Sequence, residues 1–157
     1  GRYIWHSLLL RIPIIKTLIT KVAIARFARI FSSLMGAGVS ILQSINTTAG
    51  SIGNAVIEKE LTDSAKTVQD GDQLSARLEQ STVFPPLVSQ MLAVGEETGQ
   101  TDEVLVKVAE FYEEEVDAFV GALASIIEPV MIVILGSVVG IIAASVFGPL
   151  ANLTNQI

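Results

Sequence analysis

Acidic side chains crowd one short stretch of the chain, and their spacing is compatible with metal chemistry. Four of them lie within eight residues: Glu96, Glu97, Asp102 and Glu103. Carboxylate oxygens are preferred ligands of Ca²⁺, which makes Glu96, Glu97 and Asp102 candidate metal ligands. The EF-hand spacing is absent, however, and Gly95 and Gly99 around Glu96-Glu97 indicate a tight turn between helices. We expect these acids mainly to occupy a helix start, with partner contact and then metal binding as the alternatives.

A second acidic run follows, made of Glu113, Glu114 and Glu115. It falls largely on the polar face of a helix whose other face carries an apolar stripe from Val104 to Ile127. Such a run is usually a solvated helix face. The alternative is a docking surface for a basic partner, because complementary charges steer association.

The pair Glu128-Pro129 marks the point where this amphipathic pattern becomes wholly apolar. Pro129 lacks the N–H that would bond the carbonyl of Ser125, so a kink or break is expected there. An ionised glutamate in lipid is costly, and Glu128 is therefore expected at the membrane interface. A functional contact inside the membrane is the alternative.

Other catalytic and metal chemistries have few residues to use. The chain has no cysteine and one histidine, His6. Thiolate sites and disulfides are thereby excluded, and a zinc site or a Ser–His relay lacks its partners. Gly36 and Gly38 do not fit a phosphate-binding loop. We expect no cofactor and no catalytic residue.

One segment is suited to cross a bilayer. Val130–Phe147 is free of charge, and about 19 helical residues reach roughly 28 Å, close to the ~30 Å hydrocarbon core. Gly148-Pro149 is expected to end this helix. Gly136 and Gly140 have the GxxxG spacing that allows close helix packing, although glycine is common in membrane helices in any case.

The rest of the chain reads as consecutive helices. Apolar residues recur near the 3.6-residue period, and Gly, Pro and N-cap residues separate the segments. The expected helices run from Ile15 to Met35, Ser40 to about Thr48, Val56 to Gln69, Gln73 to Gln80, Leu87 to Glu97, and from Thr101 onward. Gly50–Gly53 is expected to be a turn. The predicted fold is all-α: a six-helix cytoplasmic bundle followed by one C-terminal transmembrane helix.

Charge is distributed unevenly along the chain. Residues 1–57 carry +6, residues 58–128 carry −12 and residues 129–157 carry none. Since every base precedes the span, the positive-inside rule places the bundle in the cytoplasm and the last residues outside. The basic part could lie near anionic lipid headgroups. Nucleic acid binding is disfavoured by the acidic body.

These patterns predict four regions. Residues 1–21 form a basic juxtamembrane segment and the start of the first helix, and residues 22–128 form the bundle. Residues 129–148 form the transmembrane helix, and residues 149–157 form a short non-cytoplasmic tail.

Several motifs, taken in order, resemble the GspF/PilC family over about residues 22–153. They are Ala25-Arg26-Phe27-Ala28-Arg29, Gly36-Ala37-Gly38-Val39, Val83-Phe84-Pro85-Pro86-Leu87, Gly95-Glu96-Glu97-Thr98-Gly99, Val108–Val116, Ile127-Glu128-Pro129 and Phe147-Gly148-Pro149-Leu150. Thr101 departs from the family, whose members usually have Leu there; this exchange improves helix capping.

The resemblance implies a non-enzymatic platform protein of the bacterial inner membrane, in a type IV pilus or type II secretion machine. Family members carry two six-helix cytoplasmic domains and three spans, so this chain is expected to be the second domain with the third span. The absence of an initiator Met agrees with a fragment. The implied partners are a hexameric assembly ATPase, pilin or pseudopilin subunits, other inner-membrane components and the lipid bilayer.

Two rival functions have motives in the residues. An enzyme would need a nucleophile–base pair or paired acids, whereas the acids here are clustered at the surface. A single-span subunit of an oligomeric channel or transporter would use Glu128. Self-association is expected in either setting, given the spacing of Gly136 and Gly140.

Overall fold

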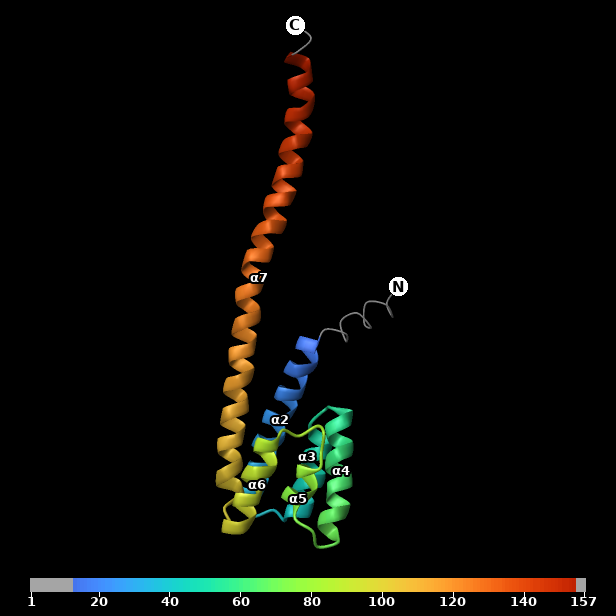
Figure 1. Ribbon diagram of the computed structural model, residues 1–157, viewed down its shortest axis with the longest axis vertical. Helices are drawn as coiled ribbons and strands as arrows, with labels where there is room; N and C mark the ends of the chain where they lie inside the picture. Colours follow the sequence, from blue (N-terminus) through green and yellow to red (C-terminus); the bar gives the residue numbers. More distant parts are fainter. Residues whose placement is uncertain (1–12, 155–157) are drawn as a thin grey trace. The chain divides into compact units, whose positions relative to one another are not determined.

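The computed structural model describes residues 13–154, with side chains up to Ala151, and these residues form six α-helices and no strand (Figure 1). The helices are α2 (Pro13–Gly36), α3 (Ile41–Ser51), α4 (Ala55–Gln69), α5 (Leu74–Glu79), α6 (Pro86–Thr98) and α7 (Thr101–Thr154). The all-α prediction is confirmed. His6, residues 1–12 of the predicted juxtamembrane segment and the last three residues of the tail lie outside the described residues.

The chain divides into two compact units, one up to Asp117 and one from Ala118 onward. The first unit is the bundle, made of α2 to α6 and the first turns of α7. The second unit consists of the rest of α7. Every contact discussed below for the bundle lies within the first unit.

Capping residues set the helix bounds much as the sequence predicts. The Asn54 side chain accepts hydrogen bonds from the backbone N–H of Val56 (3.1 Å) and Ile57 (3.2 Å), which satisfies two donors at the start of α4. Pro86 opens α6, where its missing N–H is not needed. Gly99 ends α6 in the left-handed conformation (φ 72°), which glycine adopts without a Cβ penalty.

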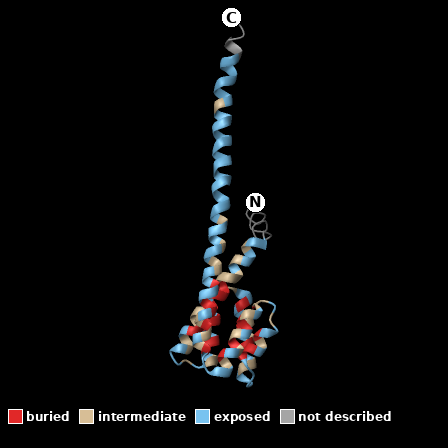
Figure 2. Ribbon diagram, turned by 60° about the vertical axis from the view of Figure 1, so that its left-hand side comes forward, coloured by how far each residue is buried: buried red, intermediate tan, exposed pale blue. Residues whose placement is uncertain are grey.

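The buried residues of the bundle gather in its interior (Figure 2), and they are mainly aliphatic with one aromatic cluster. Phe27 is fully buried in α2, stacks on Phe31 with ring centroids 5.5 Å apart, and meets the edge of Phe84 at 5.1 Å. Phe84 comes from the segment between α5 and α6. The V-F-P-P sequence therefore fastens this connection to the first helix of the bundle, and aromatic pairs of this kind stabilise by about 0.5–1.5 kcal/mol beyond their burial.

One predicted turn is shifted. Gly50 lies inside α3, which extends to Ser51, and the reversal occurs at Gly53 with φ 71°. The expected turn from Gly50 is therefore wrong by a few residues. Gly50 is tolerated because a single glycine costs a helix only about 1 kcal/mol, and the packing of buried Ile45, Thr48 and Ala49 holds the last turn.

Helix α7 continues through both of its prolines, Pro129 and Pro149. The expected end of the helix at Gly148-Pro149 is wrong, as is a break at Pro129. Pro149 removes one hydrogen bond, to the carbonyl of Ser145, whereas ending the helix there would leave four carbonyls without partners. In apolar surroundings that loss is large, so the helix persists.

Most of the apolar side chains of the second unit are exposed, by about half to two-thirds. Within the described residues, α7 is the one helix long and apolar enough to cross a membrane, and none of its most apolar window is buried. Ile132, Val133 and Ile141 are each about two-thirds exposed. Large apolar surfaces of this extent mark contact with lipid or protein, so this part of α7 is a candidate transmembrane helix.

Candidate functional site

The G-E-E-T-G sequence forms the junction between α6 and α7, and its first glycine is required by space. A Cβ built on Gly95 would lie 2.8 Å from Cα and 3.3 Å from N of Thr101. The carbonyl of Gly95 also accepts a hydrogen bond from Gln100 N–H at 3.0 Å. The backbone of α6 thus touches the backbone at the start of α7, a distance that only glycine permits.

Glu96 is directed away from the other acids of this turn. Its carboxylate accepts hydrogen bonds from the backbone N–H of Leu74 (2.9 Å) and Ser75 (3.3 Å). These are the first N–H groups of α5, and Gln73 at the N-cap position makes no side-chain cap of its own. Glu96 therefore caps a helix that lies more than twenty residues earlier in the chain.

The remaining residues of the turn do not complete a metal site. Glu97 and Thr98 are exposed, and the Thr98 hydroxyl donates to the carbonyl of Val94 at 2.8 Å. Asp102 lies at the start of α7, where a Cβ on Gly36 would be 3.6 Å from its Oδ2. No group of three acidic or histidine side chains in residues 13–154 is placed to hold a metal ion. The prediction that these acids occupy a helix start holds for Asp102 and Glu103, in the first turn of α7, and is wrong for Glu96 and Glu97, which lie in the last turn of α6. Glu96 instead caps the separate helix α5.

The acidic run of α7 is largely paired within the bundle. Glu113 receives two hydrogen bonds from the Arg29 guanidinium, from Nε to Oε1 at 3.0 Å and from Nη2 to Oε2 at 2.8 Å. Lys21 Nζ lies 2.6 Å from Glu115 Oε2. Both bases belong to α2, so two of the three acids bind α7 to α2 rather than face a partner.

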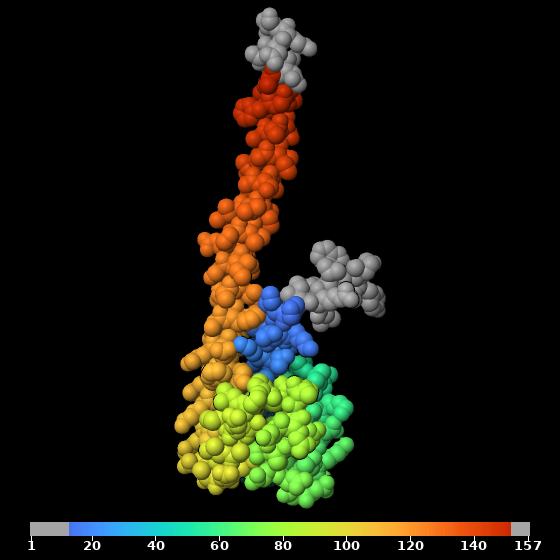
Figure 3. Space-filling model, in the orientation of Figure 1, coloured from blue at the N-terminus to red at the C-terminus, as the bar shows by residue number. Residues whose placement is uncertain are grey.

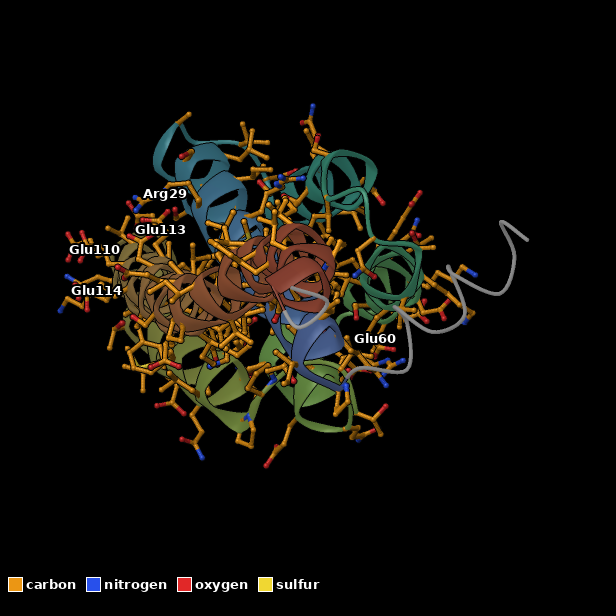
Figure 4. All side chains as sticks on the ribbon, turned by 90° about the horizontal axis from the view of Figure 1, so that it is seen from above. Arg29, Glu60, Glu110, Glu113 and Glu114 are labelled. Carbon is orange, nitrogen blue, oxygen red and sulfur yellow. The ribbon has the colours of Figure 1, made fainter. Side chains whose placement is uncertain are left out.

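Glu114 is the member of the run that remains available. Figure 4 shows Glu113 beside Arg29, while Glu110 and Glu114 point outward from the bundle. Both are exposed. A docking surface for a basic partner would therefore rest on Glu110 and Glu114 and not on the whole run.

The bidentate contact shifts the pKa of both partners. The hydrogen bonds from Arg29 hold the pKa of Glu113 below its ordinary value, and those same bonds raise the pKa of Arg29. A carboxyl whose folded pKa is depressed stabilises the fold at pH values above its unfolded pKa. This stabilisation is lost as the pH falls through the folded pKa.

We predict that Glu113→Gln lowers the free energy of unfolding at neutral pH by at most about 1 kcal/mol, because both side chains are partly solvent-exposed and screened. The difference from the unsubstituted chain should shrink as the pH falls below the ordinary glutamate range, where Glu113 is protonated in both states. This difference is measured by urea unfolding of the full chain in detergent, followed by circular dichroism from about pH 3 to about pH 7, which includes the ordinary glutamate pKa. Glu114→Gln is the control, and an equal or pH-independent loss in both variants would contradict the assignment.

The bases that pair with the acidic run were not predicted from the sequence. Arg29 and Lys21 occur in a region without any acid, and the bundle of which they form part is otherwise strongly acidic. That segregation of charge was the available signal, since opposite charges in one bundle are expected to pair. A further pair of this kind joins Arg77 Nη1 in α5 to Glu60 Oε1 in α4 at 3.0 Å.

The junction and packing residues of the second unit are all exposed. Glu128 and Pro129 lie on α7 with open surroundings, and a Cβ added at Gly136 or Gly140 would meet nothing within 4 Å. These glycines thus present a bare helix face. Their proposed role in helix association stays a prediction.

Comparison with known proteins places these features in a family. A family model described as "Type II secretion system (T2SS), protein F" matches residues 27–149. This range includes the V-F-P-P segment, the G-E-E-T-G turn, the paired acids of α7 and most of the apolar helix.

Individual relatives agree over nearly the whole chain. The Type IV pilus assembly protein PilC of Thermus thermophilus is 47% identical over 96% of this chain, and that of Myxococcus xanthus is 37% identical over 100%. The Type II secretion system protein F of Pseudomonas aeruginosa is 33% identical over 98%. The chain spans 37–38% of the length of these three relatives. The chain belongs to the type II secretion system protein F family.

Proposed function

We propose that this chain is part of a non-catalytic inner-membrane platform protein of a type IV pilus or type II secretion machine. In this role it couples a hexameric cytoplasmic assembly ATPase to the insertion of pilin or pseudopilin subunits. The names of its relatives support the two machines. The proposal does not choose between them.

One observation carries the coupling part of the proposal: the bundle and the candidate membrane segment share a helix. The first turns of α7 are bound to α2 through Glu113 and Glu115 and touch α6 at Gly95. The same helix then runs to Thr154 without interruption. A helix transmits displacement and rotation that a flexible linker would absorb.

The contacts of the acidic side chains in the bundle support a non-catalytic role. Glu96 is used as a helix cap, and Glu113 and Glu115 are used in ion pairs. In the sequence, Glu96 was a candidate metal ligand, and Glu113 and Glu115 belonged to a candidate docking surface. Their commitment to the fold agrees with a scaffold.

The orientation follows from the positive-inside rule. The bases of the chain precede the apolar segment and none follows it, which favours a cytoplasmic bundle. This orientation places the bundle on the side of an ATP-dependent motor.

The test uses the full-length protein in a bacterium whose own copy of the gene is deleted. A seven-residue Gly-Ser insertion between Asp117 and Ala118 interrupts the helix, whereas a seven-residue Ala-rich helical insertion preserves its phase within about 20°. We expect both variants to reach the membrane and to co-purify with the ATPase and pilin-like subunits. Only the helical insertion should restore pili or secretion. Full activity of the Gly-Ser variant would contradict coupling through α7.

An alternative is a subunit of an oligomeric channel or transporter. The observation that favours it is Glu128, an exposed acid within otherwise uncharged sequence that begins at Ala118. Intramembrane acids often mark ion pathways. Ion flux from proteoliposomes that is abolished by Glu128→Gln would support it. Absence of flux, together with co-purification of the ATPase, favours the platform.

A further inference from the structure

An apolar groove of about 550 Å³ lies at the end of the bundle where α2 and α4 begin. The connection between α5 and α6 contributes Thr82 and Val83 to the groove, and Figure 3 shows α2, in blue, next to the lime-green part of the chain that contains this connection. The size falls within the range of small-molecule sites. Its lining combines five apolar residues with three neutral polar residues and one base: Ile15, Ile19, Val56, Ile57 and Val83, then Thr20, Asn54 and Thr82, and Lys16.

The apolar rim of this groove is open to solvent. Val56 is 61% exposed and Ile19 is 47% exposed, and Ile14 on the adjoining turn is 49% exposed. Single exposed hydrophobic residues are ordinary on a protein surface. Two of them, Ile19 and Val56, line the same groove, which indicates a binding surface.

Lys16 gives this surface its charge. Its side chain makes no hydrogen bond or ion pair to another residue in 13–154, whereas nearby Lys21 is held by Glu115. None of the lining residues is acidic, and no acid occurs in residues 1–57. The site therefore suits an apolar ligand that carries a negative group.

Anchoring by α7 would keep the bundle close to a bilayer, whose phospholipids are ligands of this type. The sequence becomes uncharged directly after the bundle, at Ala118, and Glu128 is its one charged residue from there to the C-terminus. Because α7 leads directly from the bundle into this apolar segment, the effective concentration of lipid at the bundle surface is high. This step relies on membrane anchoring by α7 and not on the pilus or secretion role.

We propose that this groove docks the bundle onto the bilayer by binding an anionic phospholipid, with acyl carbon against Ile19 and Val56 and the phosphate at Lys16. A surface of this type inserts about 5–10 Å into the boundary between headgroups and acyl chains. The outward acids Glu110 and Glu114 belong to another face, which an anionic membrane repels. The bundle is thus held on the membrane by one defined end.

Tryptophan fluorescence of the reconstituted full chain tests the docking. Trp5 is the one tryptophan and is replaced by Phe, and a single Trp is then introduced by Val56→Trp or Ile19→Trp. Val94→Trp is the matched control, because Val94 is 49% exposed on α6 and does not line the groove. The vesicles contain phosphatidylglycerol with or without bromine on the acyl chains near the headgroup.

Bromine should quench the probes at positions 19 and 56 by about twofold, since both are placed at the depth of an interfacial group. The probe at position 94 should be unaffected. Lys16→Glu should abolish the quenching at position 56, whereas Lys107→Glu, at a second exposed base without a side-chain partner in residues 13–154, should leave it unchanged. Circular dichroism confirms that each variant is folded.

Two results would overturn the proposal. No quenching at positions 19 and 56 would show that lipid does not reach the groove. Equal quenching at positions 56 and 94 would show that the bundle has no defined lipid-facing end. Neither result would bear on assembly activity in cells, so the two proposals fail separately.

Discussion

Replacing Gly95 with Ala is expected to lower the free energy of unfolding of the bundle by about 2 kcal/mol or more, within the range for overpacked sites. The added Cβ would lie 2.8 Å from Cα of Thr101. The position of Cβ is fixed by the backbone of residue 95, and Cα of Thr101 is itself backbone, so no side-chain rotation can relieve the contact. The gain in helix propensity, about 1 kcal/mol for Gly→Ala, offsets only part of the strain. Urea unfolding of the full chain in mild detergent measures the loss.

Gly50→Ala is the matched control for this substitution. Gly50 also lies within a helix, but a Cβ there meets nothing within 4 Å. Its replacement should therefore stabilise the chain by up to about 1 kcal/mol, the ordinary propensity gain. If both alanine variants shifted the unfolding midpoint in the same direction, the close approach of α6 and α7 would not be the reason for glycine at position 95.

Glu96→Ala is expected to destabilise the bundle by about 1–3 kcal/mol, the cost of leaving partly buried donors without an acceptor. The substitution removes the acceptor of two backbone N–H groups at the start of α5. Helix α5 has six residues, too few to persist without its cap and packing. Thermal unfolding of the full chain, followed by circular dichroism, should show a lower midpoint.

Two further variants separate capping from general effects of charge. Glu96→Gln keeps one acceptor oxygen, so its loss should lie between zero and that of Glu96→Ala. The neighbouring Glu97 is exposed, and Glu97→Ala should change stability by less than about 0.5 kcal/mol. A Glu97→Ala loss as large as that of Glu96→Ala would contradict a specific role for Glu96 in capping α5.

The helices of this chain could be predicted from sequence because local chemistry determines their ends. Asn54, Pro86 and Gly99 each act within a few residues of their own position, as a cap, an N1 proline and a left-handed C-cap. The prediction that the helix ends at Pro149 was wrong because it considered only the local effect of proline. Proline usually ends a helix in water, because water can accept or donate the hydrogen bonds of the backbone groups that are freed. Apolar surroundings offer no such partners, so the helix continues.

The roles of the acids could not be predicted in the same way. The partners of Glu96 and Glu113 lie 22 and 84 residues away along the chain, and only the packed bundle brings them together. Sequence position suggested that Glu96 belonged with Glu97 and Asp102, and that Glu113 belonged with Glu114. The fold instead assigns alternate members of each cluster to different tasks, because adjacent residues on a helix point about 100° apart.

The start of α7 is held at two places, by the contact of Thr101 with Gly95 and by the ion pairs at Glu113 and Glu115. Together these contacts fix the number of residues between the two places. The two attachments lie on one helix, so the number of residues between them determines the direction in which the second faces. Adding or removing one residue would turn the acids by about 100° and shift them by 1.5 Å, away from Arg29 and Lys21. Relatives with the same bundle are therefore expected to keep the number of residues in this stretch as well as its glycine and its acids.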